Sequence, residues 1–301
     1  MHVPKEYKHQ KMTITIEPAN LSIILPCLNE AQSLQPVLTQ LKTHYPDAEI
    51  IVVDDGSTDE SAEIAAQAGA KVVRHPYSKG NGAAIKSGVR AAKGDYLVFM
   101  DADGQHDPQD IERLLAEFAQ GYDMIVGARG AKSQASFGRF CANSFYNWFA
   151  GWMVGHPIAD LTSGFRAVMA DKFKEFLYLL PNAFSYPTTI TMAFFRAGYS
   201  VAYIPIVAHT RIGKSHIKLL RDGIRFLLII FKIGTLYAPL KLFGAFSVGF
   251  FSLGLGYYTY TYTMGGRFTN MGVLLFITSV LIFLIGLVSE QITQLLYSRK
   301  E

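Results

Sequence analysis

Residues 96–108 read YLVFMDADGQHDP, a short apolar run that ends in two aspartates one residue apart. The apolar run has the length and composition of a buried β-strand. In open α/β sheets, ligands bind beyond the carboxyl ends of the strands. Asp101 and Asp103, with the amide of Gln105 two residues further on, offer the hard oxygen ligands that Mg²⁺ or Mn²⁺ prefers. Because Asp and Gly are also common in turns, this stretch alone leaves a metal site and a plain turn both open.

The same alternation of strand and helix patterns extends to both sides of this stretch. The predicted strands are 21–25, 49–53, 71–73, 96–100, 124–127 and 201–207. The predicted helices are 31–43, 59–68, 82–92, 108–120, 140–154 and 187–197. For the helix at 108–120, Asp107 is the expected N-cap and Pro108 the first helical residue. This order predicts an α/β domain with a mostly parallel, Rossmann-like sheet covered by helices.

Two further polar turns follow predicted strands. In VDDGSTD at 53–59, Asp54 or Asp55 could accept hydrogen bonds from a nucleotide base or ribose, while Ser57 or Thr58 could cap the next helix. In SKGNGAA at 78–84, the glycines would let the backbone approach a ligand, and Lys79 offers a positive charge. Each turn taken alone is equally compatible with an ordinary β–α connection.

The C-terminal part of the chain has a different composition. Half of the 301 residues are hydrophobic, 17% are charged and the net charge is +4. Residues 242–266 and 268–289 contain no Asp, Glu, Lys or Arg, and about 20 apolar residues are enough to span a bilayer. We therefore predict two membrane helices joined by a short turn at Arg267. The small net charge gives no reason to expect a nucleic-acid partner.

Basic residues recur among apolar ones before the predicted membrane helices. This pattern over 217–238 is typical of a helix that lies in the membrane interface, with a third buried or membrane-embedded helix as the alternative. The expected organisation is an N-terminal extension (1–20), one globular domain (21–216), the interfacial region (217–238) and the membrane hairpin with its tail (239–301).

Topology signals favour a cytoplasmic domain. Residues 1–20 are polar and lack the apolar core of a signal peptide. Basic residues flank the outer ends of the hairpin, and the positive-inside rule then places both termini in the cytoplasm, at the inner or cytoplasmic membrane. Cys27 and Cys141 lie far apart in the sequence, which fits a reducing compartment and predicts no disulfide and no metal site.

Taken together, the motifs resemble glycosyltransferase family 2, whose members have the GT-A fold. The residues that carry the resemblance are IILPCLNE at 23–30, VDDGSTD at 53–59, DADGQH at 101–106, GAR at 127–129, DLTSGFR at 160–166 and RIGKS at 211–215. Within that family the chain resembles the polyprenyl-phosphate glycosyltransferases related to dolichol-phosphate mannose synthase. The resemblance covers about 21–215 and the two-helix C-terminal anchor that many bacterial members carry.

The resemblance implies a role for individual positions. Nucleotide-sugar binding is implied for Pro26, Asn29, Glu30, Asp54, Asp55, Lys79, Asp101, Arg211, Lys214 and Ser215. Metal binding, to Mg²⁺ or Mn²⁺, is implied for Asp101, Asp103 and Gln105. Arg129 and Arg139 match positions that hold the lipid phosphate. The residues expected to be catalytic are Asp103, Asp160 and Arg129.

One departure from the family pattern bears on the acceptor. Many members that glycosylate a hydroxyl carry a Glu-Asp dipeptide whose aspartate is the base, and no Glu-Asp occurs in this sequence. A hydroxyl nucleophile needs a base, whereas a phosphate monoester with a second pKa near 6 is largely dianionic at neutral pH. The acceptor is therefore expected to be a phosphate. Asp160 is the nearest analogue of the missing base, or it positions the sugar or Arg129.

The expected function is inverting transfer of a sugar from a UDP- or GDP-sugar to undecaprenyl or dolichyl phosphate at the cytoplasmic membrane face. A homo-oligomer is compatible with these features. Two alternatives stay open: a family 2 transferase that acts on a lipid or glycan hydroxyl, and a membrane protein that binds a nucleotide sugar without catalysis. The sequence leaves the sugar, the nucleotide and the choice between Mg²⁺ and Mn²⁺ undetermined.

Overall fold

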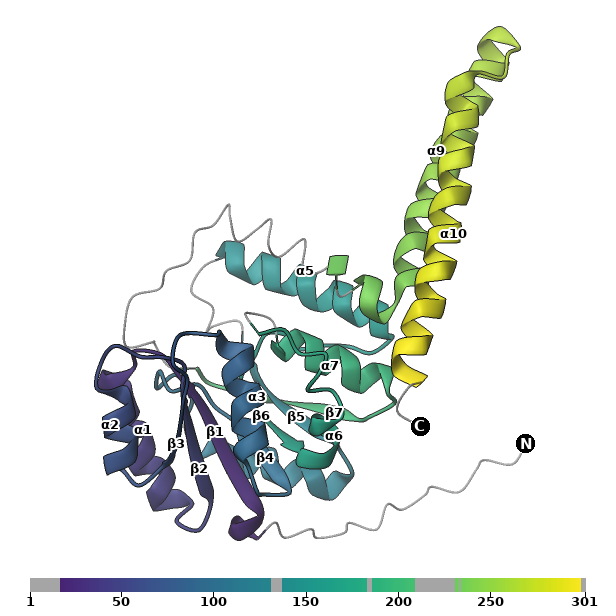
Figure 1. Ribbon diagram of the computed structural model, residues 1–301. Helices are drawn as coiled ribbons and strands as arrows, with labels where there is room; N and C mark the ends of the chain where they lie inside the picture. Colours follow the sequence, from purple (N-terminus) through teal and green to yellow (C-terminus); the bar gives the residue numbers. More distant parts are fainter. Residues whose placement is uncertain (1–16, 131–136, 183–185, 209–230, 233, 299–301) are drawn as a thin grey trace, which may run out of the picture. The chain divides into compact units, whose positions relative to one another are not determined.

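The structure of the protein is a computed structural model that describes residues 17–130, 137–182, 186–208, 231–232 and 234–298 (Figure 1). The chain divides into two compact units. The first comprises residues 1–147 and 158–216, and the second comprises residues 148–157 and 217–301. Each unit is described by itself below.

The first unit is built on a seven-stranded sheet with the strand order β3-β2-β1-β4-β6-β5-β7. The strands are β1 (Leu21–Cys27), β2 (Glu49–Asp54), β3 (Lys71–Arg74), β4 (Tyr96–Phe99), β5 (Met124–Arg129), β6 (Arg166–Met169) and β7 (Val201–Ile206). Neighbouring strands are parallel except at β6, which runs antiparallel to both β4 and β5. The expectation of a mostly parallel α/β sheet is confirmed.

Helices cover both faces of this sheet. They are α1 (Ala31–His44), α2 (Ser61–Gln67), α3 (Asn81–Ala91), α4 (Asp110–Ala116), α6 (Ala170–Lys174) and α7 (Tyr186–Arg196), with short 3₁₀ turns η1 (Pro18–Asn20) and η2 (Glu117–Gln120). Helix α5 (Phe137–Val154) begins in the first unit and ends in the second. Side chains of a strand point alternately to its two faces. On β1, Ile23 packs in one buried cluster with Leu34 of α1, whereas Ile24 faces Gly88 of α3. Thus α1 and α3 lie on opposite faces.

Contact between α3 and the sheet is close at Gly88. A Cβ atom at this position would lie 2.4 Å from Cγ2 of Ile24 and 3.2 Å from Cγ2 of Val53. We expect Gly88→Ala to destabilise the first unit by about 1–2 kcal/mol, because overpacking costs more than the helix propensity gained. Thermal denaturation in detergent measures this effect, and a midpoint equal to or above that of the wild type would contradict it.

Two details of the predicted elements were wrong. Helix α4 begins at Asp110, not at Pro108, and the carboxylate of Asp107 accepts a hydrogen bond from the Gln109 amide at 2.9 Å within the preceding turn. Neither Ser57 nor Thr58 caps α2: the Ser61 amide donates instead to Asp59 Oδ1 at 3.1 Å. In both cases an aspartate side chain closes a turn just before the helix, which delays the helix start.

The second unit contains the helical hairpin of α9 (Pro239–Gly265) and α10 (Asn270–Ser298), which lie side by side (Figure 1). Each offers a 27-residue stretch long and apolar enough to cross a membrane. The hydroxyls of Ser247 and Ser279 each donate to the other residue's carbonyl oxygen at 2.9 Å. These reciprocal hydrogen bonds satisfy polar groups between two apolar helices.

Part of the predicted interfacial region (217–238) lies outside the residues that the structure describes. Residues 217–230 and 233 are outside the described residues, so the predicted helix over 217–238 stays a prediction. The start of α9 is tied within its own unit: Lys241 Nζ donates to the carbonyl of Met153 at 3.0 Å, and the Leu240 amide donates to Glu290 of α10 at 3.3 Å. Glu290 therefore supplies an acceptor to the first turn of α9, where amide groups have no intrahelical partner.

Candidate functional site

A pocket of about 340 Å³ lies at the carboxyl ends of β1, β2 and β4. Its lining residues come from four segments: Pro26, Cys27, Leu28 and Glu30 after β1; Asp55 after β2; Ser78, Gly80, Asn81 and Ala84 at the start of α3; and Asp101, Ala102 and Asp103 after β4. The crossover connections of a parallel sheet bring these strand ends to one edge, where open α/β sheets bind ligands.

The pocket gathers five of the residues implicated from the sequence and leaves out others. Those that line it are Pro26, Glu30, Asp55, Asp101 and Asp103. Asn29 instead joins two turns: its Oδ1 accepts a hydrogen bond from the Thr58 amide at 2.8 Å, and its own amide donates to Ser57 Oγ at 2.9 Å. Its positive φ of 56° belongs to the left-handed region, which Asn tolerates better than most residues.

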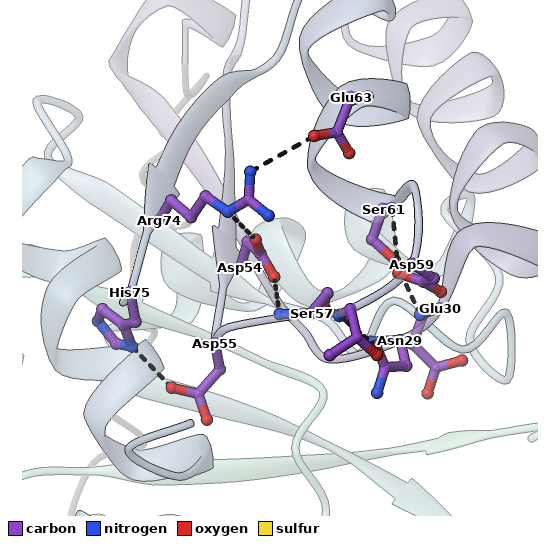
Figure 2. A network of polar contacts seen from close by, with 11 residues as sticks. Asn29, Glu30, Asp54, Asp55, Ser57, Asp59, Ser61, Glu63, Arg74 and His75 are labelled. Atoms are coloured by element: carbon purple, nitrogen blue, oxygen red, sulfur yellow. Dashed lines mark hydrogen bonds and ion pairs between the residues drawn. The ribbon is translucent and has the colours of Figure 1, made fainter. Parts of the chain in front are cut away.

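Asp54 is buried and acts within the chain (Figure 2). Its Oδ1 accepts a hydrogen bond from the Ser57 amide at 2.8 Å, and its Oδ2 lies 3.1 Å from Nε of Arg74. The side chain is 0% exposed and does not line the pocket. The structure therefore does not place Asp54 where it could contact a nucleotide in this pocket. Its carboxylate instead holds the turn after β2 and the end of β3.

Asp55, the residue after Asp54, lines the pocket. Its Oδ1 lies 2.7 Å from Nδ1 of His75 and accepts the Lys79 amide at 2.9 Å. Its Oδ2 accepts the hydroxyl of Ser78 and the amide of Gly80, both at 2.8 Å. Burial alone would raise the pKa of Asp55, but these hydrogen bonds outweigh burial and lower it. Asp55 is thus ionised at neutral pH and holds the 78–80 loop.

The contribution of Lys79 to this loop is made by its backbone. The Lys79 side chain is exposed, lies outside the pocket and carries Nζ 5.8 Å from the ring centroid of Tyr77. Gly56 permits the close approach of the two turns: it has a φ of +80°, and a Cβ there would lie 2.7 Å from the carbonyl carbon of Tyr77. The backbone of this region, rather than the lysine charge, shapes the pocket wall.

The two aspartates after β4 differ in exposure. Asp103 is 7% exposed and its Oδ1 accepts the Gln105 amide at 3.1 Å, while the Asp101 side chain is 37% exposed. Nε2 of His106 lies 3.7 Å from Oδ2 of Asp101, and the His106 ring stacks on Phe165 with centroids 4.9 Å apart. Gln105 does not line the pocket, and its backbone amide donates to the Asp103 carboxylate.

This donor set fits a hard divalent cation only in part. Asp101 and Asp103 supply carboxylate oxygens at the pocket wall. Among the residues that the structure describes, no group of three His, Cys, Asp or Glu side chains is arranged to hold a metal. Mg²⁺ is commonly bound by one or two carboxylates together with substrate phosphates. The residues present therefore fit a cation that the protein and a diphosphate would hold jointly.

Arg129, at the end of β5, forms a hydrogen-bonded ion pair with Asp160. Its Nε donates to Oδ2 of Asp160 at 2.8 Å and one terminal nitrogen donates to Oδ1 at 3.0 Å, a bidentate pair. The same guanidinium donates to Thr162 Oγ1 at 2.6 Å. Burial would lower the pKa of Arg129 and raise that of Asp160, but the charge pairing reverses both effects. Both groups are charged, and the Arg129 side chain stays 31% exposed.

The segment that carries Asp160 connects this pair to the aspartates of the pocket. The Thr162 and Ser163 amides both donate to Oδ1 of Asp160 at 3.1 Å. A Cβ at Gly164 would lie 3.1 Å from Oδ2 of Asp101, so the backbone passes directly beside that carboxylate. The 160–166 loop therefore links Arg129 to Asp101.

Arg166 closes the same loop and was not assigned a role from the sequence. It is 0% exposed, and its guanidinium donates to the carbonyl oxygens of Ser163 and Pro187 and to Thr191 Oγ1. The sequence carried no signal for this role, because no strand was predicted at 166–169, and a buried charge of this kind requires dense hydrogen bonding that only the fold shows. His75 was missed as well, since a single histidine after a strand carries no pattern.

Four implicated residues cannot be placed. Arg211, Lys214 and Ser215 lie outside the described residues, and Arg139 belongs to α5 with its side chain outside the description. Their assignments to the diphosphate and the lipid phosphate stay predictions.

An α/β sheet with carboxylates at its strand ends has the architecture of nucleotide-binding enzymes, and comparison with known families identifies which class this chain belongs to. A family model described as "Glycosyl transferase family 2" matches residues 22–177, and one described as "GtrB C-terminal hairpin" matches residues 238–295. The chain belongs to glycosyl transferase family 2 and is a glycosyltransferase with the GT-A fold.

Known relatives agree with this assignment. Glycosyltransferase AglJ of Haloferax volcanii is 29% identical over 245 residues, which cover 79% of each chain. Undecaprenyl-phosphate 4-deoxy-4-formamido-L-arabinose transferase of Pectobacterium atrosepticum is 33% identical over 203 residues, 64% of this chain and 56% of that protein. The chain thus spans little more than half the length of this second relative.

Solved structures show the same fold. Glucosyl-3-phosphoglycerate synthase of Mycobacterium tuberculosis, in complex with Mn²⁺ and UDP-glucose, superposes with a TM-score of 0.57 at 22% identity. The match covers 70% of this chain and 78% of that one. At this identity the similarity concerns the fold alone.

Proposed function

We propose that the protein transfers a sugar from a nucleotide-diphosphate sugar to a polyprenyl phosphate at the cytoplasmic face of a membrane, with inversion at the anomeric carbon. The observation that carries this proposal is the pocket in which Asp55, Asp101 and Asp103 meet, with Arg129 linked to it through the 160–166 loop. The relatives named for undecaprenyl phosphate and the hairpin model support the lipid acceptor. The UDP-glucose and Mn²⁺ of the solved neighbour support the donor and the cation.

In this mechanism, an oxygen of the acceptor phosphate forms a bond to the anomeric carbon while the bond from that carbon to the diphosphate breaks. Asp101 and Asp103 would hold Mg²⁺ or Mn²⁺, which supplies positive charge for the departing diphosphate. Arg129, whose side chain is 31% exposed, binds and orients the acceptor phosphate. Asp160 keeps that guanidinium in one orientation. Attack from the face opposite the leaving group gives inversion.

The surroundings of Asp160 favour a phosphate over a hydroxyl as acceptor. Its two oxygens accept hydrogen bonds from the Arg129 guanidinium and from three backbone amides, those of Arg129, Thr162 and Ser163. A carboxylate so engaged, with a lowered pKa, is a weak proton acceptor. A dianionic phosphate needs no such base. This argument supports Asp160 as an orienting residue rather than a general base.

The hairpin accounts for access to a lipid acceptor. Two helices of this length anchor the chain in a bilayer, and the basic residues at their outer ends would place the catalytic domain on the cytoplasmic side. The interfacial segment 217–238 would then lie against the lipid headgroups, between the globular domain of 21–216 and the anchor of 239–301.

Mass spectrometry of lipids tests the function directly. Purified full-length protein is incubated with undecaprenyl or dolichyl phosphate, Mg²⁺ or Mn²⁺, and a panel of UDP- and GDP-sugars. We expect a lipid mass increased by one sugar residue with one donor, and loss of that product when EDTA removes the cation. Transfer to a hydroxyl lipid but to no polyprenyl phosphate would contradict the proposal. Nucleotide binding without product from any donor would instead favour a non-catalytic binding protein.

A further inference from the structure

A buried histidine lies behind the pocket wall, outside the groups that the proposed reaction uses. His75 follows β3, is 5% exposed and does not line the pocket. Its Nδ1 lies 2.7 Å from Oδ1 of Asp55, and its Nε2 lies 2.8 Å from the hydroxyl of Ser87 on α3 (Figure 2 shows the contact with Asp55). The ring thus spans from the turn after β2 to the helix that begins at the pocket.

Asp55 has no freedom to move independently of these contacts. A carboxylate has about four lone-pair positions, and Asp55 receives four hydrogen bonds from the part of the chain that the structure describes: two on Oδ1 and two on Oδ2. Three of these donors belong to the 78–80 loop, of which Ser78 and Gly80 line the pocket. His75 supplies the fourth, and it is the donor that comes from outside this loop.

We propose that His75 is a positioning residue for nucleotide binding, which acts through Asp55 on the 78–80 loop. With Nδ1 directed at Oδ1 and Nε2 held by Ser87, the imidazole fixes the rotation of the carboxylate, and the carboxylate in turn fixes the loop at the pocket wall. The inference rests on the proposed nucleotide-sugar site and adds to it a residue that touches no substrate. Loss of His75 contact with Asp55 should weaken donor binding more than it slows the chemical step.

Two substitutions separate the two ends of the ring. His75→Asn places an amide nitrogen near the position of Nδ1 and keeps the hydrogen bond to Asp55. His75→Gln places its amide nitrogen near the position of Nε2, so it keeps the contact with Ser87 and loses the hydrogen bond to Asp55. We expect His75→Gln to raise the Kd of UDP or GDP and the donor KM about tenfold or more, with kcat changed less than about twofold, because a hydrogen bond to a charged group is lost. His75→Asn should stay within about threefold of wild type.

A third variant covers the case in which changes at the buried position prevent folding. Ser78 is exposed, and Ser78→Ala removes one of the four donors to Asp55 without opening the core. We expect it to raise the donor KM about threefold or more. His44→Asn and His44→Gln, at an exposed histidine on α1, are the matched controls and should match wild type.

The measurements are isothermal titration with UDP and GDP, donor KM and kcat, and thermal denaturation, all on the full chain in detergent. Equal losses in His75→Asn and His75→Gln, or a fall in kcat with unchanged donor KM, would overturn the inference. Wild-type affinity in both His75→Gln and Ser78→Ala would also overturn it while leaving the proposed function intact. If the wild-type protein itself binds neither nucleotide, the proposed function fails, and the inference fails with it.

Discussion

Asp103→Ala is expected to lower kcat/KM for sugar transfer by about a hundredfold to a thousandfold or more while the protein stays folded. Asp103 lines the pocket with a nearly buried carboxylate, and its loss removes one of the two carboxylates proposed to hold the cation against the diphosphate. Charge stabilisation of a leaving group in a site of this kind is worth a factor of about 10² to 10³ or more. Initial rates with polyprenyl phosphate and the donor found by mass spectrometry measure the loss.

Two comparisons keep this prediction specific. Asp103→Asn preserves shape and the acceptor for the Gln105 amide but removes the charge, so it should be nearly as inactive as Asp103→Ala. Asp47→Ala, at an exposed aspartate in the loop between α1 and β2, should have wild-type activity. Activity of Asp103→Asn close to wild type, with an unchanged dependence on added Mg²⁺ or Mn²⁺, would refute the metal assignment.

Local sequence pattern was sufficient for much of the fold. Short runs of β-branched and aromatic residues predicted β1, β2, β3, β4, β5 and β7 close to their observed bounds. Strand β6 was missed because it begins with Arg166. A charged residue argues against a buried strand unless its hydrogen-bonding partners are known, and those partners, Ser163, Pro187 and Thr191, come from the folded structure.

The site was predictable at the level of motifs but not of side-chain direction. In the pair Asp54 and Asp55, both residues looked equally able to meet a nucleotide. The strand alternates its side chains between opposite faces, so only one of the two can reach the pocket, and the structure assigns that place to Asp55. The pairing of Arg129 with Asp160 joins residues 31 positions apart, and no local pattern specifies such a contact.

Arg129→Ala is expected to lower kcat/KM for the polyprenyl phosphate at least about a hundredfold, with the donor KM changed little. The reason is that the proposed acceptor phosphate loses the positive charge that binds and orients it. Asp160→Ala should have a smaller effect of about tenfold, since Arg129 keeps its charge and its bond to Thr162 Oγ1 but loses its fixed orientation. Rates measured against acceptor and donor separately distinguish the two contributions.

The double variant Arg129→Ala/Asp160→Ala distinguishes an orienting role of Asp160 from a general-base role. If Asp160 acts only by orienting Arg129, removing Asp160 causes no further loss of activity once the guanidinium is absent. The double variant should then be about as active as Arg129→Ala. A general base would act independently of Arg129: the two losses would then multiply, and Asp160→Asn would reduce kcat as strongly as Asp160→Ala.

Breaking a buried ion pair costs stability, so thermal denaturation must be measured for each variant alongside its rate. Thr162→Val, which removes a neutral hydroxyl bonded to both Arg129 and Asp160 but leaves both charges in place, is the matched control for that structural cost. Non-additive losses, with Thr162→Val near wild type, would make Asp160 an orienting residue and leave the ionised acceptor phosphate as the nucleophile that needs no base.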